Sequence, residues 1–391
     1  MMTADEALPA QERDRQSPAR GAGAGERIAR VEASLHEVAV PVPLLDGRTT
    51  SWRFVLCRVE AEDGLVGHGL TGRILAPSIV AAIRSGIAPL VIGLDPFRFE
   101  AIHTLLGKRL NARAYTGVIS NALAAFDIAL HDLVGRRLGR PVAHLLGGAR
   151  DSVPAYATFG LDLYDRDELC AAARHFASMG FRGLKMVVGR SKGGWREDVA
   201  RVRAVRAAIG EEMPLMIDAN YGFPGVEARH LANAVEDCGI AFFEEPVHQN
   251  DARTLADLRR ATTIPIAAGQ MEGHRWRHRE LVEREAIDIL QPNCCYNGGY
   301  TETRKIAHLA QAYNLPLDNG GGWPAFNLHT MAGLANGGSV EYHAVTAAVT
   351  EVAFPDAPRP AGGAMKVPDA PGLGFSPDEA VLRDTRVEAD A

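Results

Sequence analysis

Hydrophobic and polar positions follow two different patterns along the chain, and the change falls near residue 150. Residues 28–60 form extended segments, residues 62–64 (EDG) supply a turn, and residues 65–69 resume the extended pattern. These segments predict a small antiparallel meander. Beyond residue 77 the spacing becomes helical, most clearly over residues 120–134, where apolar residues recur at i, i+3, i+4 and i+7. The first part of the chain is therefore expected to be an α+β domain.

After residue 151, short apolar runs alternate with amphipathic helices. The expected strands are residues 153–158, 183–188, 215–220, 241–246, 265–270, 287–293, 315–320 and 340–343. Helical spacing lies between them, for example at residues 165–179, 198–209, 225–238 and 301–313. This alternation predicts a parallel sheet with right-handed crossovers, and eight strands favour a closed TIM-type barrel. The last unit is irregular, so the pattern also allows an incomplete barrel.

Composition and charge remove several classes of function. The 391 residues carry a net charge of −6 and are 23% charged, so neither a nucleic-acid partner nor an anionic membrane is expected. No apolar run approaches the roughly 18 residues of a membrane span. Five cysteines in so long a chain do not form a disulfide framework, which predicts a reduced, cytoplasmic protein. Residues 1–26 have no apolar stretch and are predicted to be a disordered tail rather than a signal peptide.

Polar residues mark the ends of the predicted strands. A barrel places its chemistry at the C-terminal ends of its strands. The polar residues found there are Lys185, Asp218, Asn220, Glu244, Glu245, Gln270, Asn293, Asn319 and Glu341. A buried strand that ends in a carboxylate is costly unless a cation or another partner meets the charge.

Asp218 and Glu244 end successive predicted strands and should lie side by side on the barrel rim. Hard oxygen ligands with no His or Cys nearby favour Mg²⁺ over zinc. The alternative is structural: Asp218 caps the following helix, and Glu244 pairs with an arginine. The presence of both carboxylates on neighbouring strands favours the metal site.

Three strand-end motifs carry a resemblance to a known family. Residues 215–220 (LMIDAN), 242–246 (FFEEP) and 264–270 (IPIAAGQ) resemble the mandelate racemase/muconate lactonizing branch of the enolase superfamily. Within them, Asp218, Glu244 and Gln270 follow one another at an even spacing of 26 residues. The resemblance extends from about residue 28 to about residue 374.

The resemblance implies an α/β fold, a modified (β/α)7β TIM-type barrel with an α+β capping domain. It also implies that Mg²⁺, held by Asp218, Glu244 and Gln270, binds the carboxylate of a small-molecule substrate and stabilises the enediolate formed when the α-proton leaves. A homo-oligomer is expected because relatives often form dimers or octamers. The expected divisions are a tail (1–26), the capping domain (27–150), the barrel with the metal site (151–345) and a C-terminal segment that returns to the capping domain (346–391).

The sequence departs from the family pattern at four positions. The third metal ligand, normally Glu, is Gln270, whose amide oxygen can still bind Mg²⁺; Glu272 is the alternative, and the even spacing favours Gln270. The second lysine of the family's Lys-x-Lys motif is replaced by Val187. The Asp of the Asp-His dyad is Asn293, and the His falls at Gly320. Neither standard base can therefore be assigned.

Three residues remain as catalytic candidates. Lys185 is a plausible base, since a nearby cation and burial would lower its pKa. The alternative is a lysine that only pairs with a carboxylate. Glu341 matches the family's last-strand Glu, which hydrogen-bonds the developing oxyanion when protonated, and Asn293 occupies the dyad position.

The rim is rich in asparagine, and Asn220 matches the residue that contacts the substrate carboxylate in the family. Such a rim suits a polyhydroxylated substrate, because hydroxyls need hydrogen-bond partners once they lose water. Asn319 and Tyr221 are further candidates for substrate binding.

The leading functional hypothesis is a Mg²⁺-dependent lyase, a dehydratase of a sugar acid such as an aldonate or aldarate. Racemases and epimerases need two bases on opposite faces, and both standard bases are replaced here. Dehydration and cycloisomerisation need one base and one acid, so the replacements favour these reactions. An acid-binding homologue that has lost catalysis is the hypothesis from a different class.

Overall fold

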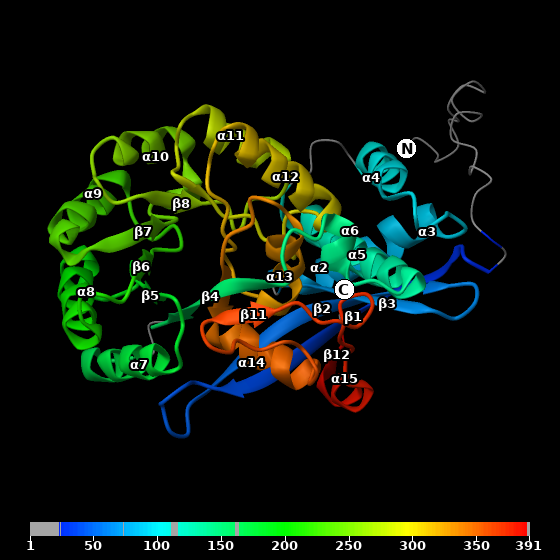
Figure 1. The fold of residues 1–391 in the computed structure, drawn as a ribbon, viewed down its shortest axis with the longest axis horizontal. Coiled ribbons are helices and arrows are strands. Elements are labelled where there is room, and N and C mark those ends of the chain that lie inside the picture. The colour runs from blue at the N-terminus through cyan, green and yellow to red at the C-terminus, as the bar shows by residue number, and fades with distance from the viewer. Residues whose placement is uncertain (1–22, 24, 73, 111–115, 161–163, 389–391) are drawn as a thin grey trace.

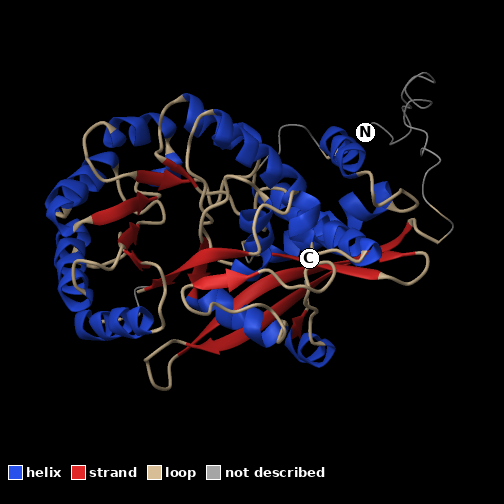
Figure 2. Cartoon of the chain, viewed as in Figure 1, coloured by secondary structure: helices blue, strands red, loops and turns tan. Residues whose placement is uncertain are grey.

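The structure, a computed structural model, describes residues 23, 25–72, 74–110, 116–160 and 164–388. Figure 1 shows two parts: a curled parallel sheet ringed by helices, and an antiparallel sheet with helices packed on both faces. Figure 2 gives the same view with strands in red and helices in blue; no strand is shared between the two sheets of the described residues. The predicted tail falls on residues 1–26 and lies mostly outside the described residues.

The antiparallel sheet is the predicted meander. Its strands are β1 (Ile28–Pro41), β2 (Thr49–Ala61) and β3 (Val66–Thr71), and the short β12 (Arg386–Val387) pairs with β1. The helical elements that follow are α2 (Ala76–Ala81), η1 (Ala82–Ile87), α3 (Ala88–Val91), α4 (Phe99–Arg109), α5 (Gly117–Leu138) and α6 (Val142–Leu146). The predicted helical stretch at 120–134 is confirmed as the centre of α5.

Helix α5 lies against β3 with its backbone almost touching the strand. A Cβ on Gly67 or Gly69 would stand 2.1 Å from the carbonyl oxygen of Ala129 or Ala125, respectively. Only glycine allows this approach. By length and composition α5 could cross a membrane, and it is the one such helix in the described part of the chain. Its apolar surface is instead buried between the sheet and the barrel.

The parallel sheet is built from alternating strands and helices, as the sequence pattern predicts. The strands are β4 (Ser152–Phe159), β5 (Leu184–Val187), β6 (Leu215–Asp218), β7 (Ile240–Glu244), β8 (Ile266–Ala268), β9 (Ile289–Leu290) and β10 (Val340–His343). The helices are α7 (Arg166–Ser178), α8 (Gly194–Ile209), α9 (Gly225–Ala234), α10 (Ala252–Arg259), α11 (Arg275–Glu283), α12 (Tyr300–Ala312) and α13 (Pro324–Gly333). In chain order, seven helices, α7 to α13, lie between β4 and β10. This number supports the (β/α)7β description.

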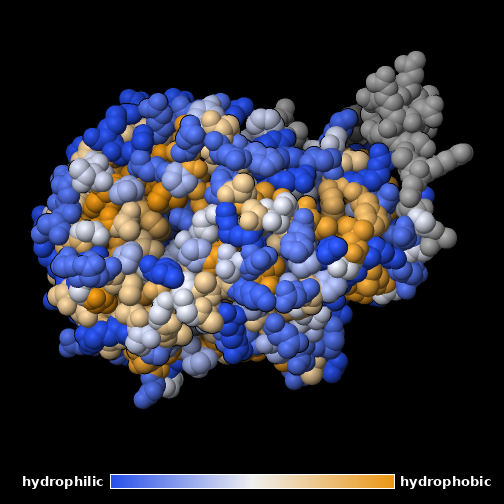
Figure 3. Space-filling model, viewed as in Figure 1, coloured by the Kyte–Doolittle hydropathy of each residue, from blue (hydrophilic) through white to orange (hydrophobic). Residues whose placement is uncertain are grey.

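Local signals explain where these elements begin. Helix α7 starts with a capping box, in which the Asp165 side chain accepts from the amide of Glu168 and the Glu168 side chain accepts from the amide of Asp165. The barrel helices direct hydrophobic residues at the strands and expose hydrophilic ones, and Figure 3 shows this as an orange interior bordered by blue.

The seventh expected strand, at residues 315–320, does not form as a full strand. Leu317 alone makes parallel bridges, to Leu290 of β9 and to Gly337 just before β10. Pro316 has no N–H to donate to a neighbour, and glycines follow at residues 320–322, so the segment cannot extend a ladder. The barrel is therefore continuous from β10 through β4 to β9, and it closes only through these bridges.

The C-terminal part of the chain links the barrel to the antiparallel sheet. Helix α14 (Ala344–Ala353) packs against β1 and β2, and β11 (Ala364–Lys366) pairs with β4. Helix α15 (Glu379–Thr385) then packs against β1, and β12 adds to the sheet edge. All five cysteines are free thiols, in agreement with the sequence-based expectation.

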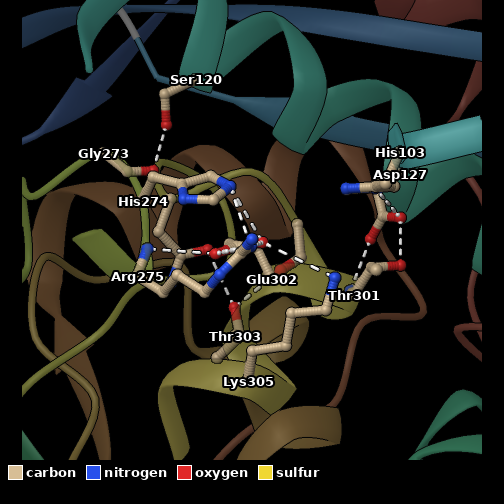
Figure 4. A network of polar contacts seen from close by, with 12 residues as sticks. His103, Ser120, Asp127, Gly273, His274, Arg275, Thr301, Glu302, Thr303 and Lys305 are labelled. Atoms are coloured by element: carbon tan, nitrogen blue, oxygen red, sulfur yellow. Dashed lines mark hydrogen bonds and ion pairs between the residues drawn. The ribbon is translucent and has the colours of Figure 1, made fainter. Parts of the chain in front are cut away.

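Buried polar contacts also join α5 to the barrel (Figure 4). Asp127 of α5 accepts hydrogen bonds from the Thr301 amide (2.9 Å) and hydroxyl (2.6 Å) at the start of α12. His103 of α4 lies 2.6 Å from the same carboxylate. Ser120 donates to the carbonyl of Gly273, ahead of α11, at 2.5 Å. The capping domain is therefore fixed to the barrel by bonds with defined geometry.

The contact between α5 and β3 gives a test of the fold. Replacing Gly69 by Ala forces the strand and helix apart, so we expect the free energy of unfolding to fall by about 1–3 kcal/mol. Gly107→Ala is the matched control, because nothing lies within 4 Å of a Cβ at this position in α4. Alanine there should raise stability by about 0.5–1 kcal/mol. Thermal unfolding followed by circular dichroism measures both, and equal midpoints for the two variants would contradict the close packing.

Candidate active site

The alternation of side chains along the strands builds the centre of the barrel. In β6 and β7, Met216 and Phe242 point inward and form a small apolar layer with Tyr156 and Ala267. Two residues further along these strands, Asp218 and Glu244 point to the same side and lie opposite each other in the sheet register. The carboxylates of Asp218 and Glu244 therefore lie directly above this apolar layer.

Lys185 of β5 lies among three carboxylates. Its Nζ is 2.5 Å from Glu244 Oε2, 3.1 Å from Glu341 Oε1 and 3.2 Å from Asp218 Oδ2. All four side chains are buried. The ring of Tyr156 lies below, with its centroid 5.6 Å from Nζ. Three negative groups thus face one positive group, which leaves two negative charges uncompensated if all are ionised.

This arrangement sets the protonation of the cluster. Burial opposes a charge on Lys185, but Glu244 and Glu341 outweigh it and hold the pKa of the lysine well above its usual value. The lowered lysine pKa expected from the sequence presupposes a neighbouring cation; with the carboxylates alone, the pKa is raised. Burial raises the pKa of Glu244 well above its usual value. Burial would raise the pKa of Glu341, but the Lys185 and His343 charges and the hydrogen bonds from Thr158 and the Gly322 amide together lower it.

The oxygen atoms of this cluster fit a hard cation. Glu244 Oε1 is buried and has no hydrogen-bond partner among the described residues. A Cβ at Gly320 would lie 3.1 Å from this atom and 3.3 Å from Gln270 Oε1. Both oxygens therefore face the backbone of Gly320, which has no side chain. No three His, Cys, Asp or Glu residues in the described ranges are arranged to hold a metal. A site here therefore needs the Gln270 amide as its third donor, beside Asp218 and Glu244.

Glu272, the alternative third ligand, is directed elsewhere. Its Oε2 accepts a hydrogen bond from Arg277 Nε at 2.9 Å, and its Oε1 accepts one from Asn250 Nδ2 at 3.3 Å. Gln270 uses only its amide nitrogen, which donates to Glu245 at 2.7 Å, and so leaves its oxygen toward the cluster. The geometry favours Gln270 over Glu272.

A cavity of about 390 Å³ opens over the cluster, and both parts of the protein line it. Thr50 and Trp52 come from β2 of the capping sheet. The barrel contributes Thr158, Val187, Arg190, Asp218, Asn220, Tyr221, Gln270, Met271, Tyr296, Gly321, Glu341, His343 and Thr346. Asn220 and Tyr221 have positive φ angles of 44° and 62°, which turn the chain sharply after β6.

Asn293 and Asn319 do not line the cavity. Asn293 Nδ2 donates to the carbonyls of Gly320 (2.6 Å) and Gly322 (3.2 Å), and its Oδ1 accepts from the amide of Cys295. Asn319 Nδ2 donates to the Gly320 carbonyl at 2.7 Å. Both amides therefore hold the glycine segment that borders the cluster.

Sequence reasoning missed three residues of the site. Arg190 follows β5 and lines the cavity, Gln291 Nε2 donates to Glu244 Oε2 at 2.8 Å, and Tyr156 supports Lys185 from below. Arg190 and Gln291 also lie just past strand ends, so the strand-end rule that identified Lys185 applies to them as well.

Comparisons with known proteins agree with this geometry. The model described as "Mandelate racemase / muconate lactonizing enzyme, N-terminal domain" matches residues 29–147, and the model described as "Enolase C-terminal domain-like" matches residues 168–381. A D-galactarolactone cycloisomerase from Agrobacterium fabrum is 36% identical over 74% of this chain and 77% of the relative. An arabinonate dehydratase from Saccharolobus solfataricus is 28% identical over 86% of this chain and 91% of the relative.

A solved structure adds a metal to the comparison. L-Talarate/galactarate dehydratase from Salmonella typhimurium LT2, liganded with Mg and L-lyxarohydroxamate, superposes with a TM-score of 0.84 at 28% identity, covering 95% of this chain and 96% of that chain. Together with the two domain matches and the barrel under its capping sheet, this shows that the chain belongs to the mandelate racemase/muconate lactonizing enzyme branch of the enolase superfamily.

Proposed function

We propose that this protein is a Mg²⁺-dependent hydro-lyase that removes water from a sugar acid. The observation that carries the proposal is the cavity over the Lys185 cluster, where metal-type oxygen donors, polar groups and a lid from a second domain meet. The named relatives, which include an arabinonate dehydratase and a talarate/galactarate dehydratase, support the same class of substrate.

Asp218, Glu244 and Gln270 would hold the metal ion. Bound there, Mg²⁺ supplies positive charge where negative charge develops on the substrate carboxylate. Two carboxylates and one neutral amide bring less negative charge than the three carboxylates usual in the family. The site therefore relies more on the substrate carboxylate to complete the charge around the ion.

Asn220 and Arg190 are the proposed substrate-binding groups. Both line the cavity, and Arg190 is the one Lys or Arg side chain among the described lining residues. Tyr221 lines the cavity beside Asn220. A planar guanidinium can pair with a carboxylate through two hydrogen bonds, which suits the second acid group of an aldarate.

Lys185 and Glu341 are the proposed proton-handling pair. Lys185 Nζ and Glu341 Oε1 are 3.1 Å apart, close enough for a proton to pass between them. Glu341 Oε2 accepts a hydrogen bond from the Gly322 amide at 2.8 Å, which fixes the orientation of the carboxylate. Asn293 contributes by holding Gly320 and Gly322, so its proposed role is positional.

Cycloisomerisation is the second candidate. The relative with 36% identity is a cycloisomerase, and that reaction also begins beside a carboxylate. The replacement of the family's dyad by Asn293 and Gly320 leaves one face of the site without its standard base, which a one-base reaction tolerates.

Proton NMR in D₂O tests the function directly. We would incubate the protein with Mg²⁺ and a panel of aldonic acids, aldaric acids and their lactones. A 2-keto-3-deoxy product is the expected result, because loss of the α-proton and the β-hydroxyl followed by ketonisation gives that skeleton. A keto-deoxy product formed from a lactone but not from the open-chain acids would instead support the cycloisomerase, because β-elimination that opens the lactone ring rearranges the substrate without loss or uptake of water. Silence across the panel would favour an acid-binding protein without catalysis.

Lys185→Met provides the matching variant for that experiment. We expect product formation to fall by at least about 10³-fold, since one proton-handling group is removed. Binding of the substrate, measured by calorimetry, should persist. Retained turnover would exclude Lys185 from the chemistry, and circular dichroism controls for folding because the substitution leaves three buried carboxylates without their lysine.

The third metal ligand can be tested apart from turnover. Gln270→Leu removes the amide oxygen and should weaken Mg²⁺ binding by about tenfold or more in isothermal titration calorimetry. Glu272→Gln is the control, and it should leave Mg²⁺ affinity unchanged because Glu272 pairs with Arg277 and Asn250. The reverse pattern would assign the ligand to Glu272.

Arg190→Ala tests the recognition of a second acid group. Removing the cation should raise KM for an aldarate by about tenfold while changing KM for the corresponding aldonate little. Steady-state kinetics with a matched pair of acids measures this difference. An equal effect on both substrates would mean that Arg190 does not contact the second carboxylate.

A further inference from the structure

A second cavity, of about 380 Å³, lies on the capping sheet away from the barrel site. It is bounded by β1, β2, η1, α15 and β12. In the sheet register Glu32 of β1 lies opposite Arg58 of β2, and His36 lies opposite Arg386 of β12. Because side chains alternate along a strand, these residues share the sheet face that is turned away from α5.

Arginine dominates the lining of this cavity. Five arginines contribute to it, and the carboxylates in the lining are Glu32 and Glu379. Arg30 pairs with Glu32, and Arg58 donates to Glu379 at 2.6 Å.

The remaining arginines have no acidic partner in the described part of the chain. Arg84 donates to the backbone carbonyl of Ala33, at 3.0 Å from Nε and 2.7 Å from Nη2, and this bond leaves its charge uncompensated. Arg383 and Arg386 form no ion pair with a described carboxylate. Three positive charges therefore remain in one cavity of a chain whose net charge is −6.

His36 lies beside the arginines of this cavity, and their charges act on it. Its side chain is buried, with Ser34 Oγ 2.7 Å from Nε2 and Thr385 Oγ1 3.2 Å from Nδ1. Burial lowers its pKa to about 4, and the charges of Arg386 and Arg58 act in the same direction. The histidine is therefore neutral near pH 7 and adds no positive charge of its own.

We propose that this cavity binds a small oxyanion with at least two negative charges, a phosphoryl group being the best match. The cavity holds a surplus of guanidinium groups, each of which offers paired donors to tetrahedral or planar oxyanions. Its arginines stand on three separate elements (η1, α15 and β12), so they can approach one anion from different sides. The proposal does not depend on the reaction at the barrel site.

Isothermal titration calorimetry with inorganic phosphate tests the site. The full-length protein, passed over a chelating resin beforehand to remove metal ions, is titrated in metal-free buffer with phosphate and, as the control, with sodium chloride of equal ionic strength. We expect saturable binding of phosphate beyond the chloride control, and a rise in the thermal midpoint at saturating phosphate, because a ligand that binds only the folded protein stabilises it. Succinate forms a second arm: tighter binding of succinate than of phosphate would overturn the preference for a phosphoryl group.

The variant Arg383→Ala/Arg386→Ala should bind phosphate about tenfold more weakly or worse, since both side chains supply charge-assisted hydrogen bonds. Arg229→Ala/Arg253→Ala is the matched control. It removes the same charge from exposed arginines of α9 and α10, far from the cavity, and should bind like the wild type. Equal loss in both variants, or no saturable binding to the wild type, would overturn the proposal.

Discussion

The buried contact between Lys185 and three carboxylates is the constraint on which the barrel site depends. Asp218, Glu244 and Glu341 lie on three different strands, and without a cation between them their mutual repulsion would oppose barrel assembly. One ammonium does not balance three carboxylates. A divalent ion at the oxygens of Asp218, Glu244 and Gln270 would compensate the remainder, which links the stability of the site to its proposed chemistry.

A second constraint concerns the placement of the lid. The capping sheet contributes Trp52 to the cavity, so its position relative to the barrel must be accurate. The close approach of α5 to β3 fixes the helix on the sheet, and Asp127 fixes the same helix to the start of α12. Helix α5 therefore contacts both parts of the protein and fixes the position of one relative to the other.

Much of this arrangement could be predicted from the sequence, because strand–helix alternation and strand-end polarity are local properties. The strand expected at residues 315–320 does not form, because Pro316 and the glycines that follow prevent pairing. The apolar pattern alone does not show this. Roles were harder to predict than positions. The pKa of Lys185 depends on charges from three strands far apart in the sequence, and Asn293 binds backbone carbonyls that only the folded loop brings to it.

The path of the chain has a consequence for exchanging parts between relatives. The lid is made by β1, β2 and β3, yet α14, α15 and β12 return from the far end of the chain to pack on it. The strands that carry Asp218 and Glu244, the proposed metal ligands, lie between these two segments. A chimera that seeks a new substrate preference by borrowing a capping domain would therefore have to take both ends of the donor chain, leaving the central segment as the recipient's own.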